Sequence, residues 1–166
     1  MRVAGIVQDD LCNGPGIRTS IFVSGCPHHC KGCHNPHLWD ASVGTVCTEK
    51  TINQIEQLLK YKGIKRGLSI LGGEPLAPHN RDEVLKLCQE LKRRIPDLNI
   101  WVWTGYKITE LTQKIFSDII NTVDVIVDGP FVMDLKPGYH LWRGSSNQRI
   151  LHCINGTVVE ESENNG

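Results

Sequence analysis

Three cysteines stand close together in one short segment of the chain. Cys26, Cys30 and Cys33 have the spacing C-x3-C-x2-C in a stretch rich in proline, glycine and histidine, which is a poor place for buried core cysteines. Three soft thiolates suit an iron–sulfur cluster or a zinc ion. A cluster held by three thiolates leaves one iron open to a substrate. A structural zinc site needs a fourth ligand, and its candidates are His28, His29, His34, His37, Cys12 and Cys47.

The remaining cysteines have simpler explanations. Cys88 falls on the apolar face of an expected helix, and Cys153 falls in an apolar strand, so both are expected in the core, where free cysteine behaves as a small hydrophobic residue. Cys12 and Cys47 are expected in loops, and we do not assign them to the metal site.

The composition is that of an ordinary globular domain. The chain has 166 residues, of which 40% are hydrophobic and 22% charged, so a disordered chain is excluded and one domain is expected. Its 18 basic residues balance 18 acidic ones, which argues against a general nucleic-acid binder. The apolar runs fall short of the roughly 20 residues that span a bilayer. The first ten residues lack the layout of a signal peptide, and we expect a cytoplasmic protein.

Strands alternate with helices along most of the chain. The expected strands are 19–23, 68–71, 99–104, 123–127 and 149–154, and the expected helices are 51–62, 80–95 and 108–120. Thr51 with Gln54 forms a capping-box pattern at the first helix, and Asn80 is the candidate cap of the second. This alternation predicts βαβ units and a mainly parallel sheet.

Length limits the fold class. A complete eight-fold β/α barrel takes about 250 residues, so we expect an open doubly wound sheet or an incomplete barrel. We expect a single α/β domain over 1–159 and a polar tail over 160–166. The turns after the first four expected strands are rich in glycine and polar groups, and they lie at the strands' carboxyl ends, where parallel α/β proteins bind ligands. These turns read GCPHHCKGC, GGEP, TGY and DGPF.

The order of motifs resembles one known family. The cysteine segment and Gly72-Gly73-Glu74-Pro75 together resemble the radical S-adenosylmethionine superfamily, and within it the activating enzymes of the anaerobic ribonucleotide reductase. The resemblance runs through most of the chain. The matching motifs are Asn13-Gly14-Pro15-Gly16-Ile17-Arg18, FVSGC (22–26), GGEPL (72–76), WVWTGY (101–106), VDGPF (127–131) and WRGSSNQ (142–148).

The resemblance implies a fold, cofactors and site residues. It implies an incomplete, open β/α barrel in which Cys26, Cys30 and Cys33 hold one [4Fe–4S] cluster, and S-adenosylmethionine binds the fourth iron. An electron from the cluster breaks the sulfonium bond of S-adenosylmethionine and leaves a 5′-deoxyadenosyl radical that abstracts a hydrogen atom. The implied cofactor-binding residues are Gly32, His34, Gly72, Gly73 and Glu74. Thr104 and Asp128 are further candidates because they lie at strand ends on the carboxyl rim, where a turn-forming aspartate is an equally good explanation. No catalytic side chain is expected beyond the cluster and the cofactor.

The residue types of the GGEP turn are suited to the cofactor-binding role that the resemblance implies. Glycines let the backbone approach a ligand closely, and the Glu74 carboxylate suits an ammonium group. One position departs from the superfamily, because an aromatic residue commonly precedes the third cysteine and Gly32 stands here. The subgroup of reductase activators tolerates this glycine, but the group that stacks on adenine is left open between His34 and an aromatic residue elsewhere.

The resemblance also implies partners. The substrate would be the large subunit of the anaerobic ribonucleotide reductase, from whose glycine the enzyme, an oxidoreductase, takes one hydrogen atom. A flavodoxin or a ferredoxin would supply the electron. The partner's glycine loop would enter the open barrel, since the irregular segment 131–144 is the only sizeable stretch left for a lid. The alternatives are an activase of another glycyl radical enzyme and, in a different class, a non-catalytic zinc-binding adaptor.

Overall fold

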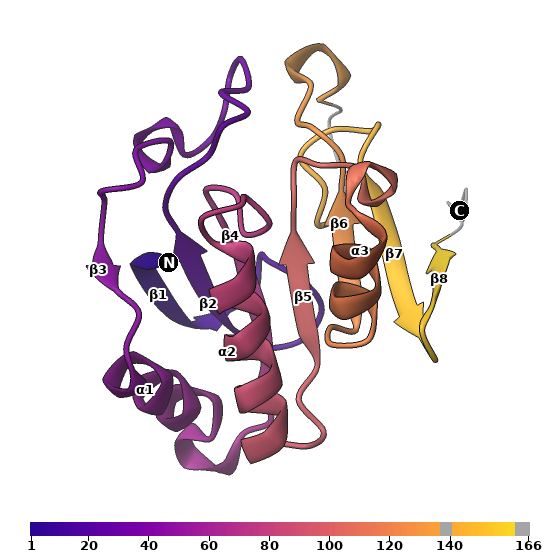
Figure 1. The fold of residues 1–166 in the computed structure, drawn as a ribbon. Coiled ribbons are helices and arrows are strands. Elements are labelled where there is room, and N and C mark those ends of the chain that lie inside the picture. The colour runs from indigo at the N-terminus through magenta and orange to yellow at the C-terminus, as the bar shows by residue number, and fades with distance from the viewer. Residues whose placement is uncertain (137–140, 162–166) are drawn as a thin grey trace.

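A single mixed sheet organises the protein (Figure 1). The computed structural model describes residues 1–136 and 141–161. Within them the strands follow the order β3-β1-β2-β4-β5-β6-β7-β8 across the sheet. The strands are β1 (Arg2–Asp10), β2 (Arg18–Val23), β3 (Thr45–Val46), β4 (Gly67–Gly72), β5 (Ile100–Trp103), β6 (Val125–Asp128), β7 (Arg149–Ile154) and β8 (Thr157–Glu160). The α-helices are α1 (Glu49–Leu59), α2 (Arg81–Arg94) and α3 (Gln113–Ile120).

The middle of the sheet is parallel and its edges are antiparallel. Strands β2, β4, β5 and β6 pair in parallel, whereas β1, β3, β7 and β8 join in antiparallel pairings. One register line runs through Ile21, Ile70, Val102 and Ile126, which are all buried. The expected parallel sheet is therefore found in the middle strands, while the antiparallel edges were not predicted.

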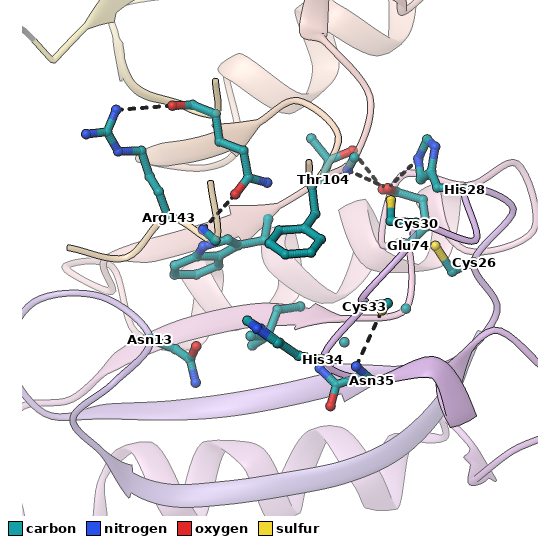
Figure 2. A pocket seen from close by; sticks show the side chains of 18 of the residues that line it. Asn13, Cys26, His28, Cys30, Cys33, His34, Asn35, Glu74, Thr104 and Arg143 are labelled. Atoms are coloured by element: carbon teal, nitrogen blue, oxygen red, sulfur yellow. Dashed lines mark hydrogen bonds and ion pairs between the residues drawn. The ribbon is translucent and has the colours of Figure 1, made fainter. Parts of the chain in front are cut away.

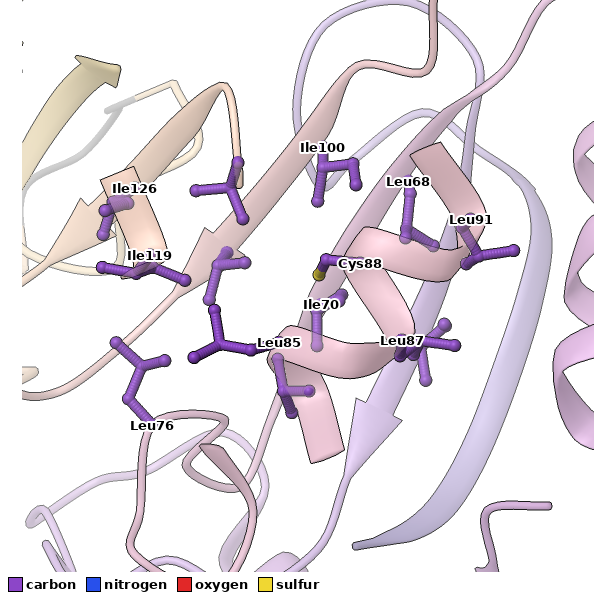
Figure 3. Close-up of a cluster of buried hydrophobic side chains, with 14 of the residues drawn as sticks. Leu68, Ile70, Leu76, Leu85, Leu87, Cys88, Leu91, Ile100, Ile119 and Ile126 are labelled. Carbon is purple, nitrogen blue, oxygen red and sulfur yellow. The ribbon is translucent and has the colours of Figure 1, made fainter. Parts of the chain in front are cut away.

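Alternation along the strands separates two cores. The helices α1, α2 and α3 lie on one side of the sheet in Figure 1, and Ile100 and Val102 belong to the large core that includes helix residues such as Leu91 (Figure 3). Trp101 points to the other side, because successive strand residues face opposite ways, and it packs in a second cluster with Val127. The second cluster lies on the side of the sheet away from the helices. No helix of the described residues has the length and hydrophobicity to cross a bilayer.

The helix boundaries depend on local capping. Helix α2 confirms the expected helix, with Asn80 at the N-cap position. The Asn80 side chain makes no capping hydrogen bond, because its amide donates instead to the Ser24 and Glu74 carbonyls. Helix α1 begins two residues before the expected start, because the true N-cap is Thr48. The Thr48 N–H donates to the Thr51 hydroxyl over 3.1 Å, and both halves of the capping box are present. The predicted pairing of Thr51 with Gln54 at the helix start was therefore wrong by three residues.

The third expected helix is divided. A short 3-10 turn covers Ile108–Glu110, and α3 begins only at Gln113. The Ile108 N–H donates to the Asp128 carboxylate over 2.9 Å, which ties the first turn to the end of β6. The following residues are extended before the helix resumes. Strands β1, β3 and β8 were not predicted, and Glu160, the first residue of the expected tail, ends β8. Residues 162–166 of that tail lie outside the described residues.

Candidate cofactor site

A cavity of about 400 Å3 opens at the carboxyl ends of the parallel strands. Residues from all four expected rim turns contribute to its wall, including Cys26, Glu74, Thr104 and Gly129 (Figure 2). The sequence prediction that the chemistry lies at this edge of the sheet is therefore supported by the position of the cavity.

The cysteine loop is shaped by its own backbone. His29 and Gly32 have φ values of 48° and 74°, in the left-handed region. The Cys26 N–H donates to the Trp39 carbonyl over 3.2 Å, and the His29 ring stacks on the Trp39 ring with a centroid distance of 4.6 Å. These contacts hold the loop against the segment that follows it, so the loop that carries the three thiols has a fixed position at the cavity.

All three predicted ligands line the cavity. Cys26, Cys30 and Cys33 are partly buried there, and the Cys33 Sγ accepts the Asn35 N–H over 3.4 Å. Burial raises the pKa of the Cys26 thiol, while the His28 and His29 N–H groups act in the opposite direction and the Glu74 charge adds to the rise. Among the described residues, no three histidine, cysteine or acidic side chains converge to hold one metal ion. Three separate soft thiolates on one cavity wall fit an iron–sulfur cluster.

The glycine turn is joined directly to the start of the cysteine loop. The Gly73 N–H donates to the Val23 carbonyl over 2.7 Å, and the Glu74 N–H donates to the Gly25 carbonyl over 3.0 Å. A Cβ on Gly73 would lie 3.0 Å from both of these carbonyl oxygens. Glycine is required at position 73 because the two backbones approach this closely.

The Glu74 carboxylate lies at the meeting point of three rim turns. Only 1% of the Glu74 surface is exposed. Its Oε1 accepts the Leu76 N–H at 2.9 Å and the Thr104 hydroxyl at 2.7 Å. Its Oε2 accepts the Gly105 N–H at 2.7 Å and the His28 Nε2–H at 2.9 Å (Figure 2). The carboxylate is therefore fully hydrogen-bonded within the protein.

The structure separates the other predicted cofactor-binding residues into two groups. His34, Gly72, Gly73, Glu74 and Thr104 line the cavity, as expected. Gly32 and Asp128 are not among the lining residues.

Each of these two residues has a structural reason for its place. A Cβ at Gly32 would lie 2.7 Å from the Met133 Sδ, so the Met133 side chain packs directly against the Gly32 backbone. Asp128 is completely buried, and both of its oxygens accept from the Arg149 guanidinium at 2.9 and 2.5 Å. The structure therefore does not bring Asp128 to the cofactor cavity.

The loop before β2 also contributes to the site, although the sequence suggested Cys12 only as a possible zinc ligand and Asn13 only as part of a matching motif. Cys12 and Asn13 line the cavity. The Asp10 carboxylate accepts the Cys12 N–H over 2.7 Å and the Asn13 side-chain amide over 2.6 Å, and it also accepts the Ser20 hydroxyl. The run Asn13-Gly14-Pro15-Gly16, which begins three residues after Asp10, is a turn signal that indicates an ordered loop here.

Tryptophans form the opposite wall. Trp103 and Trp142 line the cavity, and both pack against Trp101, with ring centroids 5.6 and 5.3 Å away. Trp101 is buried in the second core cluster, whereas Trp103 both packs against that cluster and lines the cavity.

A glutamine shapes the end of this wall. Gln148 accepts the Gly144 and Ser145 N–H groups with Oε1, at 2.7 and 3.2 Å, and donates to the Gly129 carbonyl over 2.9 Å. The loop that carries Trp142 and Gly144 is thus fixed to the end of β6. These contacts give Gln148 of the WRGSSNQ motif a structural role.

Known proteins with a similar sequence agree with this site. A family model described as a 4Fe-4S single cluster domain matches residues 12–151. The anaerobic ribonucleoside-triphosphate reductase-activating protein of Escherichia coli K12 is 45% identical over 144 residues, covering 86% of this chain and 93% of the relative. The chain belongs to this family of activating proteins. The family member from Enterobacteria phage T4 is 43% identical over 147 residues, covering 89% of this chain and 91% of the relative. That from Vibrio cholerae serotype O1 is 46% identical over 145 residues, covering 86% and 92%.

Membership in the family decides between the two kinds of metal site that the cysteine spacing left open. The chain carries a 4Fe–4S cluster domain, and the matched range includes the cysteine loop, the glycine turn and the tryptophan wall. The zinc-binding adaptor is therefore no longer needed to explain the three cysteines.

Proposed function

We propose that this protein is a radical S-adenosylmethionine activase of the anaerobic ribonucleotide reductase. It would cleave S-adenosylmethionine reductively and take one hydrogen atom from a glycine of the large reductase subunit, leaving a glycyl radical there. The observation that carries the proposal is that the cysteine loop, the GGEP turn and the TGY turn line one cavity. The family's printed name supplies the partner.

The chain's own residues would bind and orient the cofactors. Cys26, Cys30 and Cys33 would hold the cluster, and the backbone of Gly72 and Gly73 would face S-adenosylmethionine across the cavity. When bound, the cluster and S-adenosylmethionine supply the one-electron chemistry and the radical that accepts the hydrogen atom. The tryptophan wall would exclude water from that radical. A flavodoxin or a ferredoxin would supply the electron, and we propose that the protein works beside it in the cytoplasm.

The fold supports entry by a protein substrate. We propose that the sheet is an incomplete barrel of the radical S-adenosylmethionine type, open between β3 and β8, which do not pair within the described residues. Exposed apolar side chains stand beside the cavity, where Leu11 precedes lining residue Cys12 and Met133 packs against Gly32 of the cysteine loop. We propose that these exposed apolar side chains contact the partner protein.

The test is a glycyl radical on the partner. The reconstituted protein, reduced under anaerobic conditions with S-adenosylmethionine and the large reductase subunit, should produce a radical signal in electron paramagnetic resonance. Exchange of the target glycine for alanine in the reductase should remove that signal. Cleavage of S-adenosylmethionine should rise when the reductase is added, because the partner closes the open barrel. A protein that modifies a small metabolite unaided and never forms a radical on the reductase would contradict the proposal.

A further inference from the structure

His28 reaches across the cavity rim from the cysteine loop to Glu74. It lies between Cys26 and Cys30, and its Nε2 is 2.9 Å from the Glu74 Oε2. A carboxylate can only accept hydrogen bonds, so His28 Nε2 carries the hydrogen and donates it. The two residues are 46 positions apart in the chain, and the contact joins the cysteine loop to the turn after β4.

The His28 ring is also closely packed. Its side chain is 19% exposed, and its centroid lies 4.5 Å from that of the Tyr106 ring, which it meets edge-on. A Cβ on Gly105 would lie 2.6 Å from the ring, so only glycine leaves room for His28 at that position. The ring is therefore held in one place by the TGY turn while it donates to Glu74.

The neighbouring histidine makes different contacts. His29 stacks on Trp39 within 9° of parallel, and within the described residues it makes no hydrogen bond to Glu74. The two histidines thus hold the cysteine loop to different parts of the protein. His29 packs on Trp39 in the segment that follows the loop, whereas His28 binds Glu74 in the rim turns. Of the four groups that donate to Glu74, His28 is the only one contributed by the cysteine loop.

We propose that His28 is a positioning residue that acts through Glu74 to hold the cysteine loop at a fixed distance from the GGEP turn. This inference rests on the proposed function. A ligand that binds both the cluster and the GGEP turn needs these two parts in one arrangement before it arrives. If the loop has the binding-competent arrangement in only a fraction of the molecules, the apparent affinity for the ligand is the intrinsic affinity multiplied by that fraction.

The experiment compares two substitutions at the same position. His28→Phe keeps a ring against Gly105 and Tyr106 but removes the donor, whereas His28→Gln keeps an N–H donor of similar reach. We expect His28→Phe to retain the full iron and sulfide content after reconstitution and to bind S-adenosylmethionine about tenfold more weakly, which is about 1.4 kcal/mol. The change that S-adenosylmethionine causes in the spectrum of the reduced cluster should be reduced as well. His28→Gln should recover most of both effects. If the Phe ring prevents folding, His28→Ala serves in the same comparison.

A double substitution tests whether the effect passes through Glu74. In a Glu74→Gln background, His28→Phe should cause less than a twofold further change in affinity, because the acceptor is already altered. His29→Phe, which keeps a ring on Trp39, is the matched control and should bind within twofold of the wild type.

Four results would overturn the inference. These are equal affinity for His28→Phe and the wild type, additive effects in the double substitution, an equal loss in His29→Phe, and loss of the cluster in both His28 variants. A reconstituted wild type that binds no S-adenosylmethionine would overturn the proposed function and the inference together, whereas wild-type binding with any of the four results would overturn the inference alone.

Discussion

The Trp103 indole N–H donates to the Trp142 carbonyl over 2.8 Å and joins strand β5 to the loop that forms one wall of the cavity. Trp142 has a φ of 60°, in the left-handed region that a large side chain rarely adopts. A backbone held in this region persists only where the surroundings fix it. The hydrogen bond from Trp103 is one of the contacts that fix it.

Replacement of Trp103 by phenylalanine should therefore lower the free energy of unfolding by more than the loss of buried ring area alone would. We expect the free energy of unfolding to fall by about 1 kcal/mol more than in Trp39→Phe. Trp39 is the control because its buried indole N–H has no partner in the part of the chain that the structure describes. Urea unfolding of the cluster-free protein gives both values. Equal losses would mean that the bond to Trp142 adds nothing to stability.

The three cavity cysteines should differ from Cys88 in every measure of cluster binding. Cys26→Ala, Cys30→Ala and Cys33→Ala should each abolish the cluster and the cleavage of S-adenosylmethionine, because each removes one ligand. Cys88 is buried in α2 against the sheet, so Cys88→Ala should cost only about 1 kcal/mol of stability and leave the cluster intact. Iron and sulfide content after anaerobic reconstitution decides the matter. A Cys30 variant with a full cluster and normal cleavage would overturn the ligand assignment.

Asp128 should prove to be a structural residue. Asp128→Asn breaks a pair between a buried carboxylate and the partly exposed Arg149 guanidinium, and it also weakens the bond from the Ile108 N–H. We expect a loss of about 2 kcal/mol in the free energy of unfolding. The affinity for S-adenosylmethionine should stay within twofold, because Asp128 does not line the cavity. Chemical denaturation and anaerobic titration measure the two quantities, and a large loss of affinity in a stable variant would restore the cofactor role.

The pH dependence of stability should reveal the buried thiol of Cys88. Burial raises the pKa of the Cys88 thiol from its ordinary value of 9.0 to about 12. Above pH 9 the unfolded state releases this proton while the folded state keeps it, so stability that is present below pH 9 is lost as the pH rises toward 12. Between pH 9 and 10 the wild type should lose about 1 kcal/mol more than Cys88→Ala. Parallel pH dependences for the two proteins would contradict the raised pKa.

The cysteine loop and the position of the site could be predicted from the sequence alone. The C-x3-C-x2-C spacing needs only a local loop to bring three thiols to one cavity wall, and local hydrogen bonds from Cys26 to Trp39 and within the loop hold it. Strand and helix periodicity gave the parallel middle of the sheet, and parallel strands bring the turns at their carboxyl ends to one edge. These features depend on residues near one another in the chain, so their pattern can be read directly.

The contacts of each rim residue, in contrast, depend on the tertiary fold and could not be predicted from the sequence. Glu74 and His28 are 46 residues apart, and Trp103 and Trp142 are 39 apart, so no local pattern predicts either bond. Asp128 was a candidate cofactor ligand by its place at a strand end, whereas Arg149, 21 residues later, binds both of its oxygens. Strands β1, β3 and β8 and the antiparallel direction of β7 were not predicted for the same reason, since the direction and partner of a strand depend on which edge of the sheet is left unpaired when the chain arrives there.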